Sequence, residues 1–342
     1  MKKDDYVKLR DENIQTVYKK EVTENVNAVD NAHERVVRNL GLEDRVFETT
    51  KRSAFISIKD HKPNFMNDPK VRLLNPCKPE LGKVSKQILE KIIAVIRSKS
   101  KLTQFKNSDD AISWFKNLKN KKRLRFIQFD ICKYYESITL ELLENVLEWA
   151  KMYVDITNEE KEIIMESKKS FLYAGDTPWV KKGAVNFDNG MGAYDGAECC
   201  DIIGLFLLDQ LNNRIKEIAS VLFRDDGISV SDATPRLLEK ARQKIVKIFE
   251  EFGLKITSTA NLKVIQFLDI TLDLENEVFK PYIKPGDRPL YVSSDSNHPP
   301  SILKNIPLSI NRRLSSISAN REIVNAAAPL FQAELDRFGV QE

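Results

Sequence analysis

The sequence predicts an α+β fold in which an antiparallel sheet carries helices packed on one face. Three observations support this. The middle of the chain alternates between β-prone runs and segments with the apolar spacing of helices. Residues 220–230 are typical of a hairpin, because apolar residues lead to two acids and a Gly, and a β-prone run follows. The 342 residues, 42% of them hydrophobic, suffice for two or three subdomains around a substantial core.

The first 125 residues predict helices around one short hairpin. Residues 1–50 have helical periodicity around Val26–Leu40 and form an amphipathic lead-in. Residues 54–58 and 71–74 alternate like strands on either side of a turn-rich basic loop. Residues 82–98 have helical spacing, and Ser108 is expected to cap a further helix that runs through Phe115.

The middle and end of the chain give clearer signals. Phe126–Ile131 is typical of a buried strand, and residues 139–151 are typical of a helix. Thr157–Glu160 is a capping box that opens the next helix, and residues 197–215 predict a helix packed on several sides. Thr234–Gly253 predicts a helix that opens at Pro and closes at Gly. Strands at 254–257 and 264–274 follow, 277–282 turns back to pair, and the tail from about residue 300 is helical.

The bulk properties exclude several classes of protein. No apolar run approaches the roughly 20 residues of a membrane span, and no apolar stretch near the start suggests a secretory signal. The four cysteines show no Cys-x-x-Cys pattern and there are three histidines, so we expect no zinc site. Reduced thiols are the default, and we expect an intracellular protein, in the cytoplasm or the nucleus.

Basic charge is concentrated ahead of the acidic hairpin. Residues 51–125 contain 20 Lys/Arg and 6 Asp/Glu, a net of +14 against +4 for the whole chain, so the remaining residues carry −10. A block this basic suggests a polyanion such as nucleic acid, because neutralising phosphates releases counterions. The alternative is a set of solvated helix faces, for which residues 116–125 are suited.

Three acids form the candidate chemical site. Asp225 and Asp226 are adjacent and repel each other, and a divalent cation with oxygen ligands such as Mg²⁺ would offset that repulsion. The alternative is an ordinary Asp-Gly hairpin turn. Asp130 ends the strand 126–131, where a buried charge is costly unless it is paired or bound to metal. If the two strands are neighbours, the three carboxylates can bridge two Mg²⁺ ions for in-line displacement at phosphorus.

Motifs in this order resemble the palm and fingers of reverse transcriptases. Each alone is weak, and the agreement of their order and spacing carries the resemblance. In the palm, Phe129–Tyr135 resembles Phe-Asp-x with a later Tyr, Gly192–Cys200 resembles Gly-x-x-Gln-Gly-x-x-x-Ser, and Phe223–Asp226 resembles aromatic-x-Asp-Asp. Gly253–Lys263 resembles Gly-Leu with a later Lys, and Phe267–Asp269 resembles the primer grip Phe-Leu-Gly. The segments that resemble the fingers motifs are Lys59–Pro63 and Val71–Pro76.

The resemblance covers about residues 51–300 and implies a right-hand polymerase. It divides the chain into a helical lead-in (1–50), basic fingers (51–125), a palm (126–275) and a short thumb-like region (276–342). A Lys-Pro, a Tyr-Val and a Ser-x-His-Pro between Lys280 and Pro299 resemble Penelope-like retroelement enzymes. The implied activity is RNA-directed DNA polymerase, which extends a primer 3′-hydroxyl with dNTPs.

The resemblance also implies partners and site roles. The template is RNA, the primer is DNA or RNA, a further RNA or protein completes the thumb, and two Mg²⁺ ions, or Mn²⁺, are the cofactors. The implied metal ligands are Asp130, Asp225, Asp226 and the Ile131 carbonyl. Tyr135 would exclude a 2′-hydroxyl, Arg72 with Lys59 or Lys62 would clamp the triphosphate, Gly196 would admit the template, and Lys263 would be the general acid.

Simpler roles stand beside several of these. Tyr135 also suits a core aromatic, any one lysine suits a solvated surface, and His298 either touches the primer or caps a turn.

Departures from the family pattern keep other functions open. Asp195 replaces the usual Gln and would repel phosphate unless it pairs with a base or a Lys. Arg224 either pairs with a carboxylate or points away, and Glu136 is also unusual. The alternatives are a catalytically weakened nucleic-acid-binding protein that keeps the fold, and an RNA-directed RNA polymerase, against which Tyr135 weighs.

Overall fold

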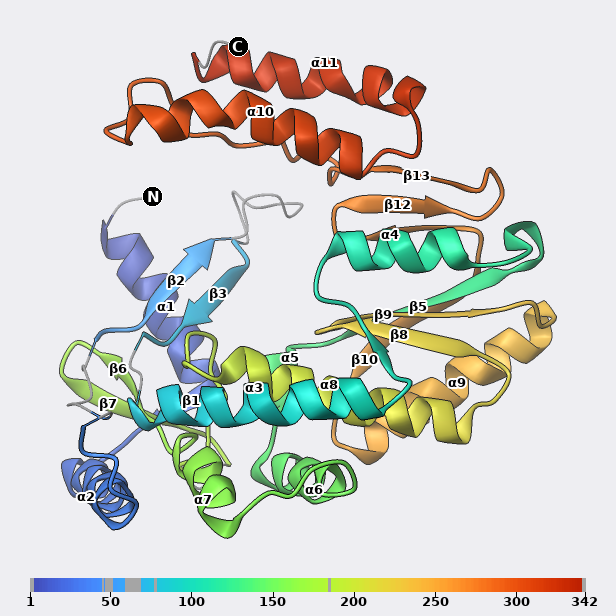
Figure 1. Cartoon of the computed structure of the whole chain (residues 1–342). Coiled ribbons are helices and arrows are strands. Elements are labelled where there is room, and N and C mark those ends of the chain that lie inside the picture. The colour runs from blue at the N-terminus through green and yellow to red at the C-terminus, as the bar shows by residue number, and fades with distance from the viewer. Residues whose placement is uncertain are drawn as a thin grey trace. The chain divides into compact units, whose positions relative to one another are not determined.

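A computed structural model describes residues 3–44, 46, 52–58, 69–76, 79–183 and 186–339. The chain divides into two compact units, each assembled from separate stretches of sequence. The first comprises Met1–Thr103, Ile131–Arg214 and Ile245–Thr257; the second comprises Gln104–Asp130, Ile215–Lys244 and Ser258–Glu342. Figure 1 follows these stretches by colour along the chain. The expected boundaries at residues 50, 125 and 275 stay a prediction.

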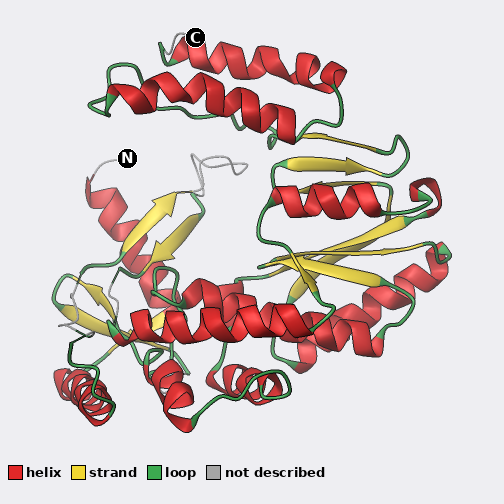
Figure 2. Cartoon of the chain, viewed as in Figure 1, coloured by secondary structure: helices red, strands yellow, loops and turns green. Residues whose placement is uncertain are grey.

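The first unit is mainly helical, as Figure 2 shows in red. Its helices are α1 (Lys3–Val17), α2 (Thr23–Asn39), α3 (Leu81–Lys99), α5 (Tyr134–Ser137), α6 (Leu140–Ala150), α7 (Asn158–Glu166) and α8 (Gly196–Arg214). Its strands are β1 (Tyr18–Lys20), β2 (Phe55–Ile58), β3 (Val71–Leu74), β6 (Leu172–Ala174) and β7 (Thr177–Lys181). β2 pairs with β3 as a hairpin, and β1, β7 and β6 form a small antiparallel sheet.

Local sequence explains the helices of the first unit. The Thr139 hydroxyl accepts a hydrogen bond from the Leu142 amide at the start of α6, and Thr157 and Glu160 form the expected capping box of α7. Apolar side chains surround α8, which packs against α3 and α6 and is buried on most sides. These predictions are confirmed.

The second unit is built on a five-stranded sheet with strand order β10-β5-β9-β8-β4. Its strands are β4 (Thr103–Gln104), β5 (Arg125–Ile131), β8 (Ala219–Phe223), β9 (Asp226–Ser231) and β10 (Ile256–Leu262). A second antiparallel sheet contains β11 (Val264–Phe267), β12 (Ile270–Asp273) and β13 (Val278–Pro281). Helical elements are α4 (Ser108–Asn117), η1 (Lys121–Arg123), α10 (Pro300–Ser316), α11 (Arg321–Arg337) and the first part of α9 (Pro235–Glu251), whose residues from Ile245 onward belong to the first unit.

One hydrophobic cluster joins the two sheets of this unit through α4. It combines Phe115 of α4 and Phe126 of β5 with Ile228 of β9 and Phe267 of β11, all nearly inaccessible to solvent. Figure 1 shows α4 lying between the larger sheet and β12. Burying these aromatic side chains fixes the large sheet, and with it the position of the acids.

Two local predictions change. Asn107, not Ser108, caps α4, because its side chain accepts a hydrogen bond from the Asp110 amide. Ser108 instead donates to Asp269. The expected strand 264–274 is a hairpin, since Leu268 turns the chain with φ 56° between β11 and β12. Among the helices of the described ranges, none has both the length and the apolar character that a membrane span requires.

Candidate active site at the acidic hairpin

Asp225 and Asp226 occupy different positions of the β8–β9 hairpin. Phe223 pairs with Asp226, so Arg224 and Asp225 alone make the turn, with Arg224 in the left-handed region at φ 51°. Asp226 is the first residue of β9 and not part of the tip. The alternative of an Asp-Gly turn is wrong, because Gly227 is a strand residue. The turn therefore presents one carboxylate, and the strand presents the other.

Gly227 is required by the ring packed against it. Gly227 pairs with Phe129 across β5 and β9, and a Cβ built on Gly227 would lie 2.0 Å from Phe129 Cε2. No side chain fits at that distance. Sequence reasoning missed this role, although a Gly inside a strand pattern is itself a signal for close approach.

The register of β5 and β9 brings Asp130 opposite Asp226. β5 has strands on both sides in the sheet, and one of them, β9, belongs to the acidic hairpin, so the condition for convergence of the acids is met. Directly opposed residues in antiparallel strands have Cβ atoms about 5 Å apart, so the two carboxylates share one small region. The expectation that Asp130 is buried is wrong, because its side chain is exposed at the end of the strand.

Negative charge accumulates at Asp226. Burial, then Asp225 and then Asp130 raise the pKa of Asp226 to about 6, while Lys284 opposes the shift. Like charges and low solvent access both disfavour the ionised carboxylate. Sequence reasoning did not single out Lys284, which follows β13 and places a cation within reach of the acids.

The chemistry of these donors fits a hard divalent cation. Carboxylate oxygens suit Mg²⁺, and a cation would relieve the repulsion at Asp226. The described residues contain no group of three or more His, Cys, Asp or Glu side chains already placed to hold a metal ion. Asp130 is exposed and Asp225 is half-buried, so both side chains have room to turn toward a shared ion beside Asp226.

Tyr135, Gly196 and Arg72 belong to the first unit and are described separately from the acids. Tyr135 lies in α5 and is partly exposed, whereas its neighbour Tyr134 is the buried core aromatic and donates a hydrogen bond to the Cys200 carbonyl at 2.8 Å. A Cβ built on Gly196 would lie 3.5 Å from Tyr135 Cε1. The Tyr135 ring thus lies beside the first residue of α8.

Two glycines of the Gly192–Cys200 segment differ in what they require. A Cβ on Gly192 would collide with the Asn75 carbonyl oxygen at 2.4 Å, and Gly192 has φ 116°. A Cβ on Gly196 meets only ordinary contacts. The packing of the chain itself therefore demands glycine at 192 and leaves position 196 unexplained by internal sterics.

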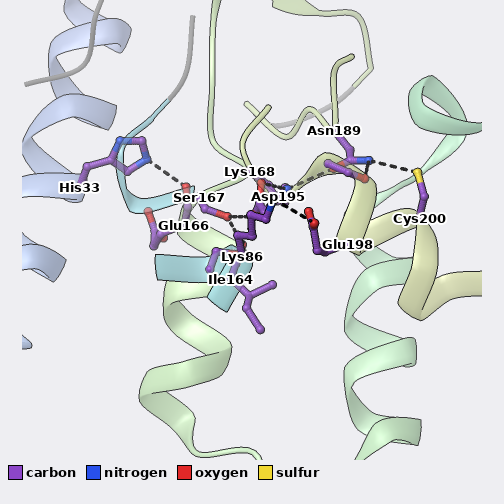
Figure 3. Close-up of polar contacts among 12 residues, drawn as sticks. His33, Lys86, Ile164, Glu166, Ser167, Lys168, Asn189, Asp195, Glu198 and Cys200 are labelled. Carbon is purple, nitrogen blue, oxygen red and sulfur yellow. Dashed lines mark hydrogen bonds and ion pairs between the residues drawn. The ribbon is translucent and has the colours of Figure 1, made fainter. Parts of the chain in front are cut away.

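Asp195, the residue that departs from the family pattern, points into the protein. It is fully buried, and the Lys168 ammonium lies 2.5 Å from Asp195 Oδ1. Figure 3 shows this pair with the side chains of Ser167 and Asn189 around it. Pairing with a Lys was one of the two ways in which a carboxylate here could avoid repelling phosphate. The Lys was not identified from the sequence, because Lys168 lies in a polar segment without motif character.

The structure does not bring Lys263 to the acids. Lys263 Nζ donates to the carbonyls of Lys122 and Leu124, at 2.6 and 2.8 Å. Leu124 precedes β5 and Asp130 lies near its other end, a separation of about 20 Å along an extended strand. The general-acid role implied for Lys263 has no geometric support here.

The other predicted side chains lie at the surface or outside the described residues. Arg72 is exposed on β3, and Lys59 and Lys62 lie outside the described residues. The Arg224 guanidinium lies 5.7 Å from the Phe223 ring centroid. Of the two expectations for Arg224, an ion pair with a carboxylate does not occur within the described ranges, and the guanidinium lies near the Phe223 ring instead.

The structure also shows what surrounds Glu136 and His298, the two remaining residues discussed from the sequence. Glu136 lines a cavity of about 140 Å³ beside β3 and the loop 190–191. His298 Nδ1 lies 2.6 Å from Ser296 Oγ in the segment that precedes α10, which favours the turn role.

Comparison with solved structures identifies the fold. Telomerase from Candida albicans in complex with a TWJ fragment of telomeric RNA matches with TM-score 0.56 and 12% identity, over 98% of this chain and 57% of that one. Apo telomerase from Candida tropicalis matches with TM-score 0.56 and 12% identity, over 97% and 63%. The chain has a polymerase fold. The predicted fold class is thus confirmed.

The likeness concerns structure more than sequence. The chain spans about three fifths of the length of these telomerase structures. No protein-family model matches the sequence, and no curated protein matches it either.

Proposed function

We propose that this chain is an RNA-directed DNA polymerase that extends a primer 3′-hydroxyl with dNTPs on an RNA template. The observation that carries the proposal is the register that sets Asp130 against Asp226, with Asp225 in the adjoining turn. The polymerase fold shared with telomerase, a reverse transcriptase, supports it. The Lys280–Pro299 motifs support assignment to the Penelope-like retroelement enzymes.

Asp130, Asp225, Asp226 and the Ile131 carbonyl would hold two Mg²⁺ ions. When bound, these ions would neutralise phosphate charge and lower the pKa of the attacking hydroxyl. The chain itself contributes the fixed backbone positions of Asp130 and Asp226 in two paired strands. Rigid strands hold ligands more precisely than loops do, and the turn gives Asp225 the freedom to complete the set.

Residues of the first unit would select the substrate. Tyr135 is partly exposed beside Gly196 and would exclude a 2′-hydroxyl, while Gly196 lets the backbone approach a template strand closely. Arg72 is exposed, and its planar guanidinium suits a triphosphate, with Lys59 or Lys62 as a second cation.

The domain roles follow from the same proposal. Residues 51–125 serve as fingers, 126–275 as palm and 276–342 as a short thumb that an RNA or protein partner completes. The basic charge of the fingers segment supports contact with the template backbone.

Primer extension tests the proposal. Purified protein is incubated with an RNA template, a DNA primer, dNTPs and Mg²⁺, and the same assay is run with NTPs in place of dNTPs. We expect Mg²⁺-dependent extension with dNTPs that Asp226→Asn and Asp130→Asn abolish. Asp232→Asn is the matched control, because Asp232 is exposed just beyond the other end of β9. No extension on any template refutes the proposal, and preference for NTPs favours an RNA polymerase.

A second function, nucleic-acid binding without turnover, is favoured by one observation. The motif residues depart from the family pattern, with Asp195 in place of the usual Gln and Arg224 directly before Asp225. Binding alone predicts salt-sensitive association with RNA that neither Mg²⁺ nor Asp226→Asn alters. Binding measured with and without Mg²⁺, beside the extension assay, separates the two functions.

A further inference from the structure

The Lys168–Asp195 pair is the centre of a fully satisfied buried network. Both side chains are fully buried. Asp195 Oδ2 accepts hydrogen bonds from Ser85 Oγ at 2.5 Å and Ser167 Oγ at 2.8 Å, while Oδ1 faces Lys168 Nζ at 2.5 Å. Burial opposes the charge on Lys168, but Asp195 and Cys199 together outweigh burial and raise the pKa of Lys168. Lys168 therefore keeps its proton in the interior of the first unit, in contact with the Asp195 carboxyl group.

Such a pair needs a reason beyond stability. Removing two charges from water offsets much of their attraction, so apolar residues of similar volume would stabilise the fold about as well. Buried ionic groups are best attested where they fix one arrangement among several. We therefore expect this network to fix the arrangement of the residues bonded to it.

The network extends from Lys168 to the start of α8. Lys168 Nζ donates to Asn189 Oδ1 at 3.1 Å, and Asn189 Nδ2 faces the Gly196 carbonyl at 3.4 Å and Cys200 Sγ at 3.9 Å. Figure 3 shows Asn189 between Lys168 and Cys200, with dashed lines on both sides. Gly196 in turn lies beside Tyr135, at the position where a Cβ would be 3.5 Å from the ring.

A second connection leads to the same aromatic pair. The Tyr134 hydroxyl donates to the Cys200 carbonyl, one turn of α8 after Gly196. The first turn of α8 thus contacts Asn189, Tyr134 and Tyr135. A shift of Asn189 would reach Tyr135 through Gly196.

We propose that Lys168, Asp195 and Asn189 are positioning residues that set how strictly Tyr135 discriminates between dNTPs and rNTPs. They act through Gly196 and the first turn of α8, which form the wall beside the Tyr135 ring. The role rests on the proposed polymerase function. It also explains why a carboxylate stands where the family pattern has Gln: the side chain at 195 faces a buried lysine and no longer faces a substrate.

The experiment measures kcat/KM for dNTP and for rNTP incorporation in four proteins. Lys168→Met with Asp195→Leu removes both charges together, so that neither is left buried alone. Asn189→Ala cuts the connection to Gly196 and keeps the ion pair. Lys169→Met is the matched control, because Lys169 is the adjacent lysine, is half-buried and pairs with Glu166 instead.

We expect the dNTP-to-rNTP ratio to fall by about tenfold or more in the double variant and in Asn189→Ala, mainly through faster rNTP use. The ratio of Lys169→Met stays that of the wild type. A loss shared equally by both nucleotides, with an unchanged ratio, marks a merely structural role and overturns the inference. If the double variant fails to fold, Asn189→Ala decides alone. Absence of extension by the wild type overturns the polymerase proposal itself.

Discussion

Replacing Asp226 with Asn should stabilise the metal-free protein at neutral pH while it abolishes primer extension. The carboxylate is largely buried, is opposed by Asp130 and adjoins Asp225, and its pKa is about 6 against an ordinary 3.8. A difference of about 2 pH units at about 1.4 kcal/mol each gives about 3 kcal/mol. Asn keeps the size of the side chain and removes its charge, so the variant recovers this free energy.

The sign depends on which state binds the proton more tightly. Because the pKa of Asp226 is raised in the folded state, that state binds more protons than the unfolded chain between pH 3.8 and about 6. The contribution of Asp226 to the free energy of unfolding therefore falls as pH rises through this window, and the loss is complete above it. Wild type and Asp226→Asn should have equal stability near pH 3.8 and differ by about 3 kcal/mol at pH 8.

Urea unfolding at pH 4, 5, 6 and 8 measures this difference. The buffer contains EDTA, so that no divalent cation neutralises the acids, and little salt, because salt screens the repulsion. Asp232→Asn is the control, and it should follow the wild type at every pH. Equal stability of Asp226→Asn and wild type at pH 8 would refute the claim that burial and the neighbouring acids disfavour the ionised Asp226 carboxylate in the folded protein.

Three further predictions concern packing and ion pairs. Lys168→Met alone should lower the free energy of unfolding by about 3–5 kcal/mol, because it leaves Asp195 charged and buried, and adding Asp195→Leu should recover most of that loss. Gly227→Ala should destabilise the second unit by about 1–3 kcal/mol by collision with Phe129, and Phe129→Leu should relieve the collision in the double variant; urea unfolding checks both. Arg313→Met should release α10 from Asp269 at a loss of about 1 kcal/mol and speed hydrogen exchange in that helix, whereas the adjacent Arg312→Met should not. Unchanged exchange in Arg313→Met would contradict the proposed anchoring.

Local signals predicted most of the elements. The capping box at Thr157 and the Pro–Gly boundaries of α9 depend on neighbouring residues alone, so they were readable in advance. The Ser108 cap failed because Asn107, one residue earlier, competes for the same amide, and only the distant Asp269 gives Ser108 another partner. Local chemistry permits both caps, and a long-range contact chose between them.

The sequence by itself determined the class of fold and the order of the candidate motifs. Periodicity, caps and the spacing of Asp130, Asp225 and Asp226 are properties of the chain that folding does not change. They left open whether the strand that ends at Asp130 lies beside the acidic hairpin, and the sheet order of the folded chain supplied that neighbourhood.

Only the tertiary structure decided which partner each charged side chain takes. Asp195 pairs with Lys168, and Lys263 donates to carbonyls at the far end of β5 from Asp130. Strand register alone places Asp130 against Asp226 and Phe129 against Gly227. Such choices depend on residues far apart in sequence, because the favourable position of a charge is set by the solvent and the opposite charges that folding brings to it.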